Sequence, residues 1–237
     1  MLAHHDDEVF CAGHLRRELD AGARITLLWA TAGGLAPAGR RIAEGDRALA
    51  ALGLPATAGI DLRLPDQHAV EHVAAIAAEI GRLLAPAPAH PRDAVYVPAY
   101  EGGHPDHDAV NLAAALGAAS RGVRVLEFPL YRRGALGLAV QSPLAPLGTA
   151  RDRFAVLPLV ERDLALRRAL ARANASQLVP SLLPLLTVAR WAGRGRTEPA
   201  RPLPAHDYAL PPHPGRLLYE LYTPWRFAAW ATEALRG

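Results

Sequence analysis

The chain has 237 residues, 51% of them hydrophobic, and a formal net charge of +3. This length and balance are typical of a globular protein with a substantial buried core. All 26 basic residues are arginine and they are scattered among acidic residues, which argues against nucleic-acid binding. No apolar run reaches the roughly 18 residues that span a bilayer. No basic-then-apolar leader is visible, so we expect no membrane span and a cytoplasmic location.

The first half of the chain alternates short apolar segments with longer amphipathic ones. Strands are expected over 24–30, 59–62, 94–97 and 123–128. Helices are expected over 9–21, 41–52, 70–84 and 108–119. This alternation predicts βαβ units, and therefore an α/β, Rossmann-like fold whose mainly parallel sheet carries helices on both faces.

The second half has a less regular pattern. It is expected to contain a strand at 154–157, a helix at 161–173 and a short helix within 220–235. The segment 190–214 is rich in Gly, Pro and Arg and is expected to form an extended loop near the mouth of the site. No repeat or domain boundary is visible. We therefore expect a single domain over 1–237, with a core of about 1–130 and an irregular Pro/Gly-rich extension of about 131–237.

Two clusters combine imidazoles with carboxylates. His4-His5-Asp6-Asp7-Glu8 lies near the start of the chain, and Gly103-His104-Pro105-Asp106-His107-Asp108 follows the strand expected at 94–97. Ligands of open α/β sheets bind outside the carboxyl ends of the strands, so both clusters are expected to face one site. Helix capping accounts for acids at such places, but it does not account for the histidines at 4, 104 and 107.

A metal is the simplest use of these residue types. His4 and Asp7 are three residues apart and can converge on one cation, and a ligand from the second cluster would leave an open position for water. Similar ligand sets hold Fe(II), so the residues alone leave the metal undecided. A neighbouring carboxylate would take a proton from the water, and a second imidazole would stabilise an oxyanion and protonate a departing amine.

The two motifs resemble those of the LmbE-like (PIG-L) de-N-acetylase family, which carries His-Pro-Asp-Asp-Glu and, further along the chain, His-Pro-Asp-His. The resemblance implies Zn²⁺, with Fe²⁺ or another divalent metal as alternatives, bound by His4, Asp7 and His107. It also implies a general base, an electrophilic imidazole and a residue that orients this imidazole: Asp6, His104 and Asp106 respectively. The implied reaction removes the N-acetyl group from an N-acetylated sugar-containing small molecule.

Two further segments resemble substrate-binding parts of this family. Arg41-Ile42-Ala43-Glu44 resembles its Arg-x-x-Glu helix, which implies that Arg41 binds the sugar; a solvated ion pair with Glu44 is the alternative. Leu64-Pro65-Asp66 resembles a Pro-Asp loop, which implies that Asp66 also binds substrate; an ordinary turn is the alternative.

Other positions resemble the family less closely. Ala175-Ser176-Gln177 resembles a Ser-Gln segment of the C-terminal half. His5 replaces the motif proline, and only Met1-Leu2-Ala3 precede the first motif where the family has a full strand.

Other functions are compatible with the same scaffold. An amidase acting on a thiol or antibiotic conjugate and a catalytically inactive sugar-binding module are the two alternatives. A nucleotide-binding Rossmann protein is disfavoured because Gly33-Gly34 does not form a Gly-x-Gly-x-x-Gly fingerprint.

Overall fold

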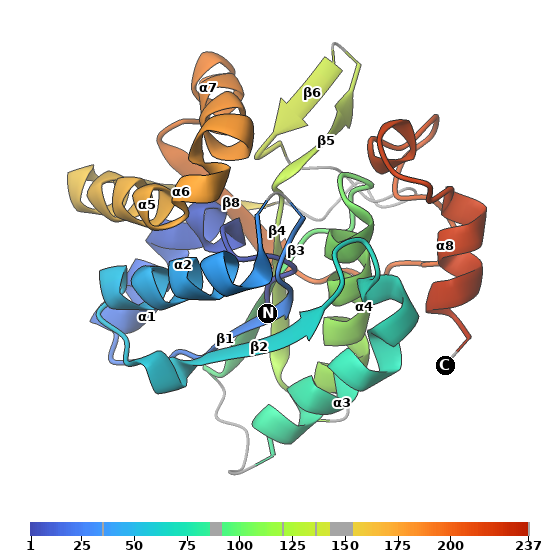
Figure 1. The fold of residues 1–237 in the computed structure, drawn as a ribbon, viewed down its shortest axis with the longest axis horizontal. Helices are drawn as coiled ribbons and strands as arrows, with labels where there is room; N and C mark the ends of the chain where they lie inside the picture. Colours follow the sequence, from blue (N-terminus) through green and yellow to red (C-terminus); the bar gives the residue numbers. More distant parts are fainter. Residues whose placement is uncertain (35, 86–91, 120, 136, 143–153, 237) are drawn as a thin grey trace.

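The structure is a computed structural model that describes residues 1–34, 36–85, 92–119, 121–135, 137–142 and 154–236 (Figure 1). The strands are β1 Leu27–Thr31, β2 Gly59–Leu64, β3 Ala94–Pro98, β4 Arg124–Phe128, β5 Tyr131–Gly134, β6 Gly137–Val140, β7 Ala155–Pro158 and β8 Thr197–Pro202. The α-helices are α1 Ala12–Asp20, α2 Ala38–Ala51, α3 Val73–Leu83, α4 Pro105–Ala119, α5 Glu161–Ala173, α6 Ala175–Gln177, α7 Leu183–Trp191 and α8 Phe227–Ala234. Short 3₁₀ helices are η1 Asp7–Cys11, η2 Ala56–Ala58, η3 Ala69–His72 and η5 Tyr219–Leu221, and η4 Leu178–Leu182 is a π-helix.

Parallel strand pairs form the centre of the molecule. β1 pairs with β2, and β3 pairs with β4, in both cases parallel. The first residues of the chain join the two pairs, because Leu2 forms a parallel bridge with Trp29 and the amino group of Met1 donates to the carbonyl of Tyr96 at 2.8 Å. The three residues that precede the first motif therefore lie between β1 and β3, and the predicted α/β architecture is confirmed.

Helices cover both faces of this sheet. Side chains of β1 alternate between two hydrophobic clusters: Leu27 and Trp29 belong to one, Leu28 and Ala30 to the other. The first cluster includes side chains of α1, α2, α5 and α7, and the second includes side chains of α3, α4 and α8. Figure 1 shows α1 and α2 on one side of the strands and α3 and α4 on the other. This period-two burial is what a strand covered on both faces requires.

The C-terminal half is more regular than its composition predicts. β8 pairs antiparallel with both β4 and β7, so the prediction of an extended loop over 190–214 is wrong for this strand. Its buried polar residues are ion-paired: Glu198 lies 2.8 Å from the Arg167 guanidinium, and Arg201 Nε donates to Glu127 at 2.7 Å. The β5–β6 hairpin and α7 were not predicted either. Among the described helices, none combines the length and the apolar character needed to cross a membrane.

Candidate metal centre and active site

The two polar clusters meet where β1 and β3 end. Residues 4–8 run from the bridged N-terminal segment into η1, while His104 precedes α4 and His107 lies in its first turn. His4 Nδ1 lies 3.2 Å from His107 Nε2, although 103 residues separate them along the chain. The two clusters therefore lie in one site, as the order of the strands predicted.

Three of the predicted ligands have spacing that suits a metal. His107 Nε2 lies 3.2 Å from Asp7 Oδ1, and His4 Nδ1 lies 3.9 Å from the same oxygen. Ligand atoms 2.0–2.1 Å from a tetrahedral zinc lie about 3.3 Å from one another. The triad is therefore close to the geometry that such an ion requires, and all three side chains are buried.

Asp7 is oriented by the backbone. The N–H groups of Ala3 and His4 both donate to its Oδ2 at 2.9 Å, which leaves Oδ1 facing the two imidazoles. Burial opposes its charge, but the imidazoles of His107 and His4 outweigh burial and hold the pKa of Asp7 well below its usual range. This carboxylate therefore stays ionised, as a metal ligand must.

His4 is oriented from its other side. Its Nε2 lies 3.3 Å from Asp106 Oδ2 and 3.3 Å from Asp66 Oδ1. Asp106 is itself fixed by the N–H groups of Gln67 and Ala69, at 2.7 and 3.0 Å. A proton on Nε2 held by these carboxylates leaves the Nδ1 lone pair for a cation, the usual arrangement around metal-binding histidines. Burial opposes a charge on His4, but Asp106, Asp66 and Asp7 outweigh burial and raise the pKa of His4 well above its ordinary value. The surroundings of this ring therefore favour a positive charge.

Asp6 lies beside the triad with one oxygen free. Its backbone has φ of 122°, a conformation that L-residues rarely adopt. Arg41 Nη2 donates to its Oδ1 at 3.0 Å, and within the described ranges no hydrogen bond reaches Oδ2. Burial raises the pKa of Asp6 to about 8, with the charge of Arg41 opposing and that of Asp7 adding to the effect. Such a carboxyl group exchanges a proton near neutral pH, which suits a general base.

His104 is a neutral hydrogen-bond donor. The N–H of Asp106 donates to its Nδ1 at 3.2 Å, so its own proton resides on Nε2. Burial, reinforced by the charge of His4, lowers the pKa of His104 to about 3. The carboxylate of Asp106 lies 3.9 Å from His104 Nδ1, beyond hydrogen-bond length, so the backbone rather than the side chain of Asp106 contacts this ring.

This tautomer also bears on a second group of residues that could hold a metal, namely His4, Asp66, His104 and Asp106. The Nδ1 lone pair of His104 is taken by a backbone N–H, and both oxygens of Asp106 accept backbone N–H groups. The set is therefore better suited to orienting His4 than to holding a second ion.

Comparison with protein families agrees with the geometry. Residues 1–117 match the family model PIG-L, described as GlcNAc-PI de-N-acetylase. Residues 1–117 belong to the PIG-L family. A search of curated protein sequences gave no match.

Solved structures share the fold of this chain at low sequence identity. A conserved protein, TT1542, from Thermus thermophilus is 22% identical over 87% of this chain and 94% of that one, with a TM-score of 0.61. The A40926 pseudoaglycone deacetylase Dbv21 is 22% identical over 85% and 95%, with a TM-score of 0.60. The N,N'-diacetylchitobiose deacetylase from Pyrococcus horikoshii is 18% identical over 86% and 82%, with a TM-score of 0.53. These likenesses show a shared fold over most of the chain.

The two predicted substrate-binding residues differ in exposure: Arg41 is buried and Asp66 is partly exposed. Arg41 is 1% exposed, and its guanidinium donates to Glu44 at 2.7 Å and to the carbonyl of Ala32 at 3.0 Å as well as to Asp6. The alternative of a solvated ion pair is wrong, because Glu44 is fully buried. Arg41 Nε, Nη1 and Nη2 each donate to a protein group within the described residues, and the predicted sugar contact of Arg41 stays a prediction.

Asp66 lies at the rim of the site. Its side chain is 24% exposed and faces His4, and a Cβ at Gly34 would come within 2.5 Å of its Oδ2. Burial opposes ionisation, but His4 outweighs it and lowers the pKa of Asp66 to about 2. A charged acceptor at the rim suits a sugar hydroxyl, so this role stays a prediction.

Sequence patterns did not indicate several residues around the site. Tyr222 OH donates to the carbonyl of Gly103 at 2.7 Å, and the ring of Tyr131 lies 5.4 Å from that of His107. Trp225 Nε1 donates to the carbonyl of Gln67 at 2.7 Å. All three aromatic residues come from the second half of the chain, and no motif marks them.

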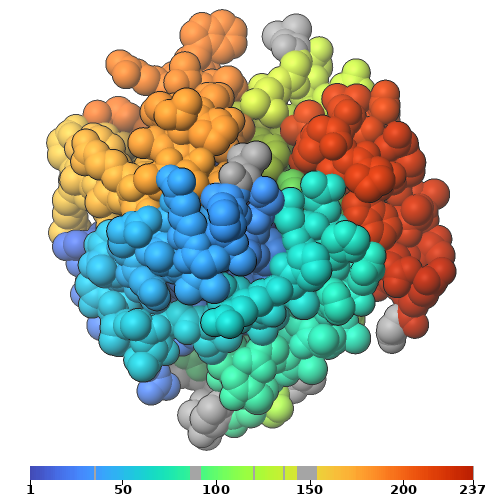
Figure 2. Space-filling view, in the orientation of Figure 1, coloured from blue at the N-terminus to red at the C-terminus, as the bar shows by residue number. Residues whose placement is uncertain are grey.

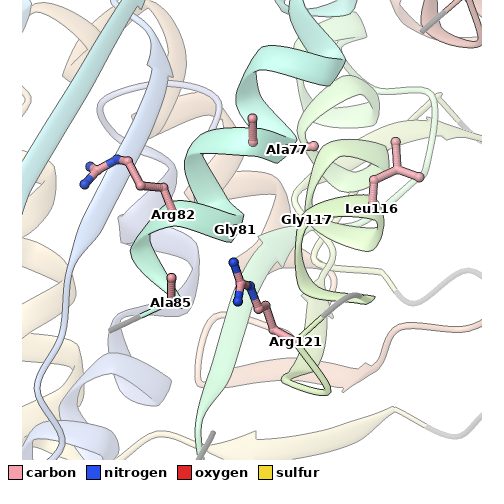
Figure 3. Close-up of a pocket in the computed structure, with 8 residues that line it drawn as sticks. Ala77, Gly81, Arg82, Ala85, Leu116, Gly117 and Arg121 are labelled. Atoms are coloured by element: carbon pink, nitrogen blue, oxygen red, sulfur yellow. The ribbon is translucent and has the colours of Figure 1, made fainter. Parts of the chain in front are cut away.

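A separate cavity of about 580 Å³ lies between α3 and α4. Figure 3 shows the small residues and the two arginines, Arg82 and Arg121, that line it. It is at the opposite end of α4 from His107 and contains none of the site residues. The cavity is therefore distinct from the candidate active site.

Proposed function

We propose that the chain is a zinc-dependent hydrolase that removes the N-acetyl group from an amino sugar or its conjugate. The observation that carries the proposal is the meeting of His4, Asp7 and His107 with Asp6 beside them. We also infer one domain over 1–237, since a single hydrophobic cluster contains side chains of α1, α2, α5 and α7.

His4, Asp7 and His107 would hold the metal through Nδ1, Oδ1 and Nε2. A divalent ion bound there lowers the pKa of a coordinated water and polarises a carbonyl group. Zinc is the ion we propose; the same donor set also suits Fe(II). The Asp106–His4 contact would fix the ring that faces the ion.

The remaining residues would move protons. Asp6 Oδ2 would accept a proton from the attacking water while the water oxygen bonds to the amide carbon. His104 Nε2–H would donate a hydrogen bond to the carbonyl oxygen as negative charge develops on it. The C–N bond then breaks, the departing amine takes the proton held by Asp6, and acetate and the free amino sugar leave. Asp66 would hold the sugar at the rim.

The test measures zinc content and acetate release together. Wild-type protein, titrated with zinc from substoichiometric amounts to excess, is assayed on an N-acetylglucosaminide. The titration matters because one neighbour of this fold is described as a zinc-inhibited form of teicoplanin deacetylase. We expect one zinc per chain and stoichiometric acetate. Asp6→Asn should keep its zinc and lose activity by about 10²–10⁴-fold, whereas His107→Ala should lose zinc.

A control separates these effects from general damage. His68 is an exposed histidine that pairs with Glu71 at 2.9 Å, and His68→Asn should keep both zinc and activity. Zinc-loaded wild type that binds the sugar without releasing acetate would instead identify an inactive binding module.

A second candidate substrate is an amide in an antibiotic conjugate. It is favoured by the likeness of the fold to the A40926 pseudoaglycone deacetylase. Parallel assays of an N-acetylglucosaminide, an antibiotic conjugate and an acylated aminothiol distinguish these three classes of substrate. The preferred substrate is the one with the highest kcat/KM.

A further inference from the structure

The backbone of Asp6 needs an external restraint. A non-glycine residue at φ of 122° is strained and persists only where its surroundings fix it. We propose that the segment 174–177 positions Asp6 through two chains of hydrogen bonds. This inference rests on the proposed role of Asp6 as general base.

The first chain fixes the Asp6 carboxylate. The N–H and hydroxyl of Ser176 donate to the two oxygens of Glu44, at 2.8 and 2.7 Å. Glu44 accepts from Arg41 Nη1 at 2.7 Å, and Arg41 Nη2 donates to Asp6 Oδ1 at 3.0 Å. Glu44 is fully buried and Arg41 is 1% exposed, so neither is free to move into solvent.

The second chain fixes the Asp6 backbone. The side-chain amide of Asn174 donates to Glu8 Oε1 at 2.8 Å, and the N–H of Asp6 donates to Glu8 Oε2 at 3.0 Å. Both Asn174 and Glu8 are fully buried. The two chains begin at Ser176 and Asn174 and both end on Asp6. The segment 174–177 therefore supports both the side chain and the backbone of Asp6.

The arrangement leaves one oxygen for chemistry. Arg41 holds Oδ1, and Asp6 retains 14% exposure of its side chain toward the site. A guanidinium contacts Asp6, Glu44 and the Ala32 carbonyl at once, which an ammonium group cannot reproduce. Displacing a reacting group by about 1 Å costs on the order of 10²-fold in rate.

The contact between the two halves of the chain is visible in the figures. Figure 1 shows α6 next to α2, and Figure 2 shows the orange surface of residues near 175–190 directly against the blue surface of the N-terminal third. The segment 174–177 lies outside residues 1–117, which match the family model.

The first experiment compares Arg41→Lys with Arg40→Lys. Both arginines lie on α2 and pair with Glu44, but Arg40 is 58% exposed and does not reach Asp6. In zinc-loaded protein we expect Arg41→Lys to lower kcat about 10- to 100-fold with KM and zinc content within twofold of wild type. Arg40→Lys should match wild type. A raised KM with unchanged kcat would overturn the proposal and make Arg41 a substrate-binding residue.

The second experiment keeps the proposal testable if Arg41→Lys folds poorly. Ser176→Ala removes only the hydroxyl from the first chain and should lower kcat about threefold to tenfold, whereas Ser176→Thr should restore most of the rate. Ser181→Ala, on the adjoining π-helix, is the matched control. Equal rates for Ser176→Ala and Ser181→Ala would overturn the proposal.

A third measurement does not depend on activity. Amide hydrogen exchange of the peptide that covers residues 4–11 should speed up at least several-fold in Arg41→Lys and Ser176→Ala, with or without zinc, and stay at the wild-type rate in both controls. If wild-type protein hydrolyses no amide, the proposed function fails but exchange still decides the positioning. Unchanged exchange in both variants would refute it.

Discussion

The buried carboxyl group of Glu101 should make the stability of the protein depend on pH. Its side chain is 1% exposed; Oε1 accepts the N–H of Leu130 at 2.6 Å, while Oε2 has no partner among the described residues. Burial raises the pKa of Glu101 to about 8, against the opposing Leu130 hydrogen bond and the charge of Arg132. An acid whose pKa is higher in the folded state binds its proton more tightly when folded. Its contribution to stability is fully present below the unfolded pKa and is lost as pH rises through about 8.

The replacement Glu101→Gln imitates the neutral acid and removes this loss. With an unfolded pKa near 4.5 and a folded pKa of about 8, wild type should lose about 2 kcal/mol between pH 6 and pH 8 that Glu101→Gln keeps. Urea unfolding of chelator-treated protein at both pH values measures the difference. Glu161→Gln is the control, because Glu161 is fully exposed and the hydrogen bond from Arg196 lowers its pKa, so it is ionised in both states across this range. Parallel stability curves for wild type and Glu101→Gln would refute the reasoning.

Three further predictions concern packing, buried charge and metal. Gly103→Ala should lower the free energy of unfolding by about 1–3 kcal/mol, because the added Cβ would overlap the carbonyl of Tyr131. Gly39→Ala, with open space around the added Cβ, should be neutral or slightly stabilising, and urea unfolding compares the two variants. Glu198→Ala should cost about 3–5 kcal/mol in the same assay, since it leaves the buried Arg167 without its carboxylate. Zinc binding should release about one proton, because the pKa of His4 is raised well above its usual value and ligation through Nδ1 requires the neutral ring; calorimetry in buffers of different ionisation enthalpy should show this, and enthalpies independent of the buffer would contradict it.

Much of the fold was predictable because local patterns and burial agree. The apolar segment at 24–30 became β1, whose alternate residues serve the two cores, and the acids and imidazoles after the strands met as strand order predicts. β8 was not predictable from the same patterns. It contains Pro199 and Pro202, and its buried Glu198 and Arg201 depend on partners far away in sequence. Hydrophobic periodicity cannot reveal a strand whose burial depends on ion pairs.

Arg41 shows the same limit inside the site. Its spacing to Glu44 predicts an ion pair, and both predictions made for it, a solvated pair or a sugar contact, assume an accessible guanidinium. Burial rules out the solvated pair, because Glu44 is fully buried and Ser176 donates to it from the other half of the chain, while the sugar contact stays a prediction. A single sequence contains no local pattern that pairs residue 44 with residue 176.

The second half of the chain therefore completes a site whose chemistry lies in the first. Residues 1–117 contain every group proposed to bind metal or move protons. The segment 174–177, which supports the restraint on Asp6 through Glu8 and Glu44, lies beyond them, as do the aromatic residues beside His104 and His107. A strained base is tolerable only while both restraints hold, so loss of the contacts made by 174–177 should impair catalysis before it impairs metal binding.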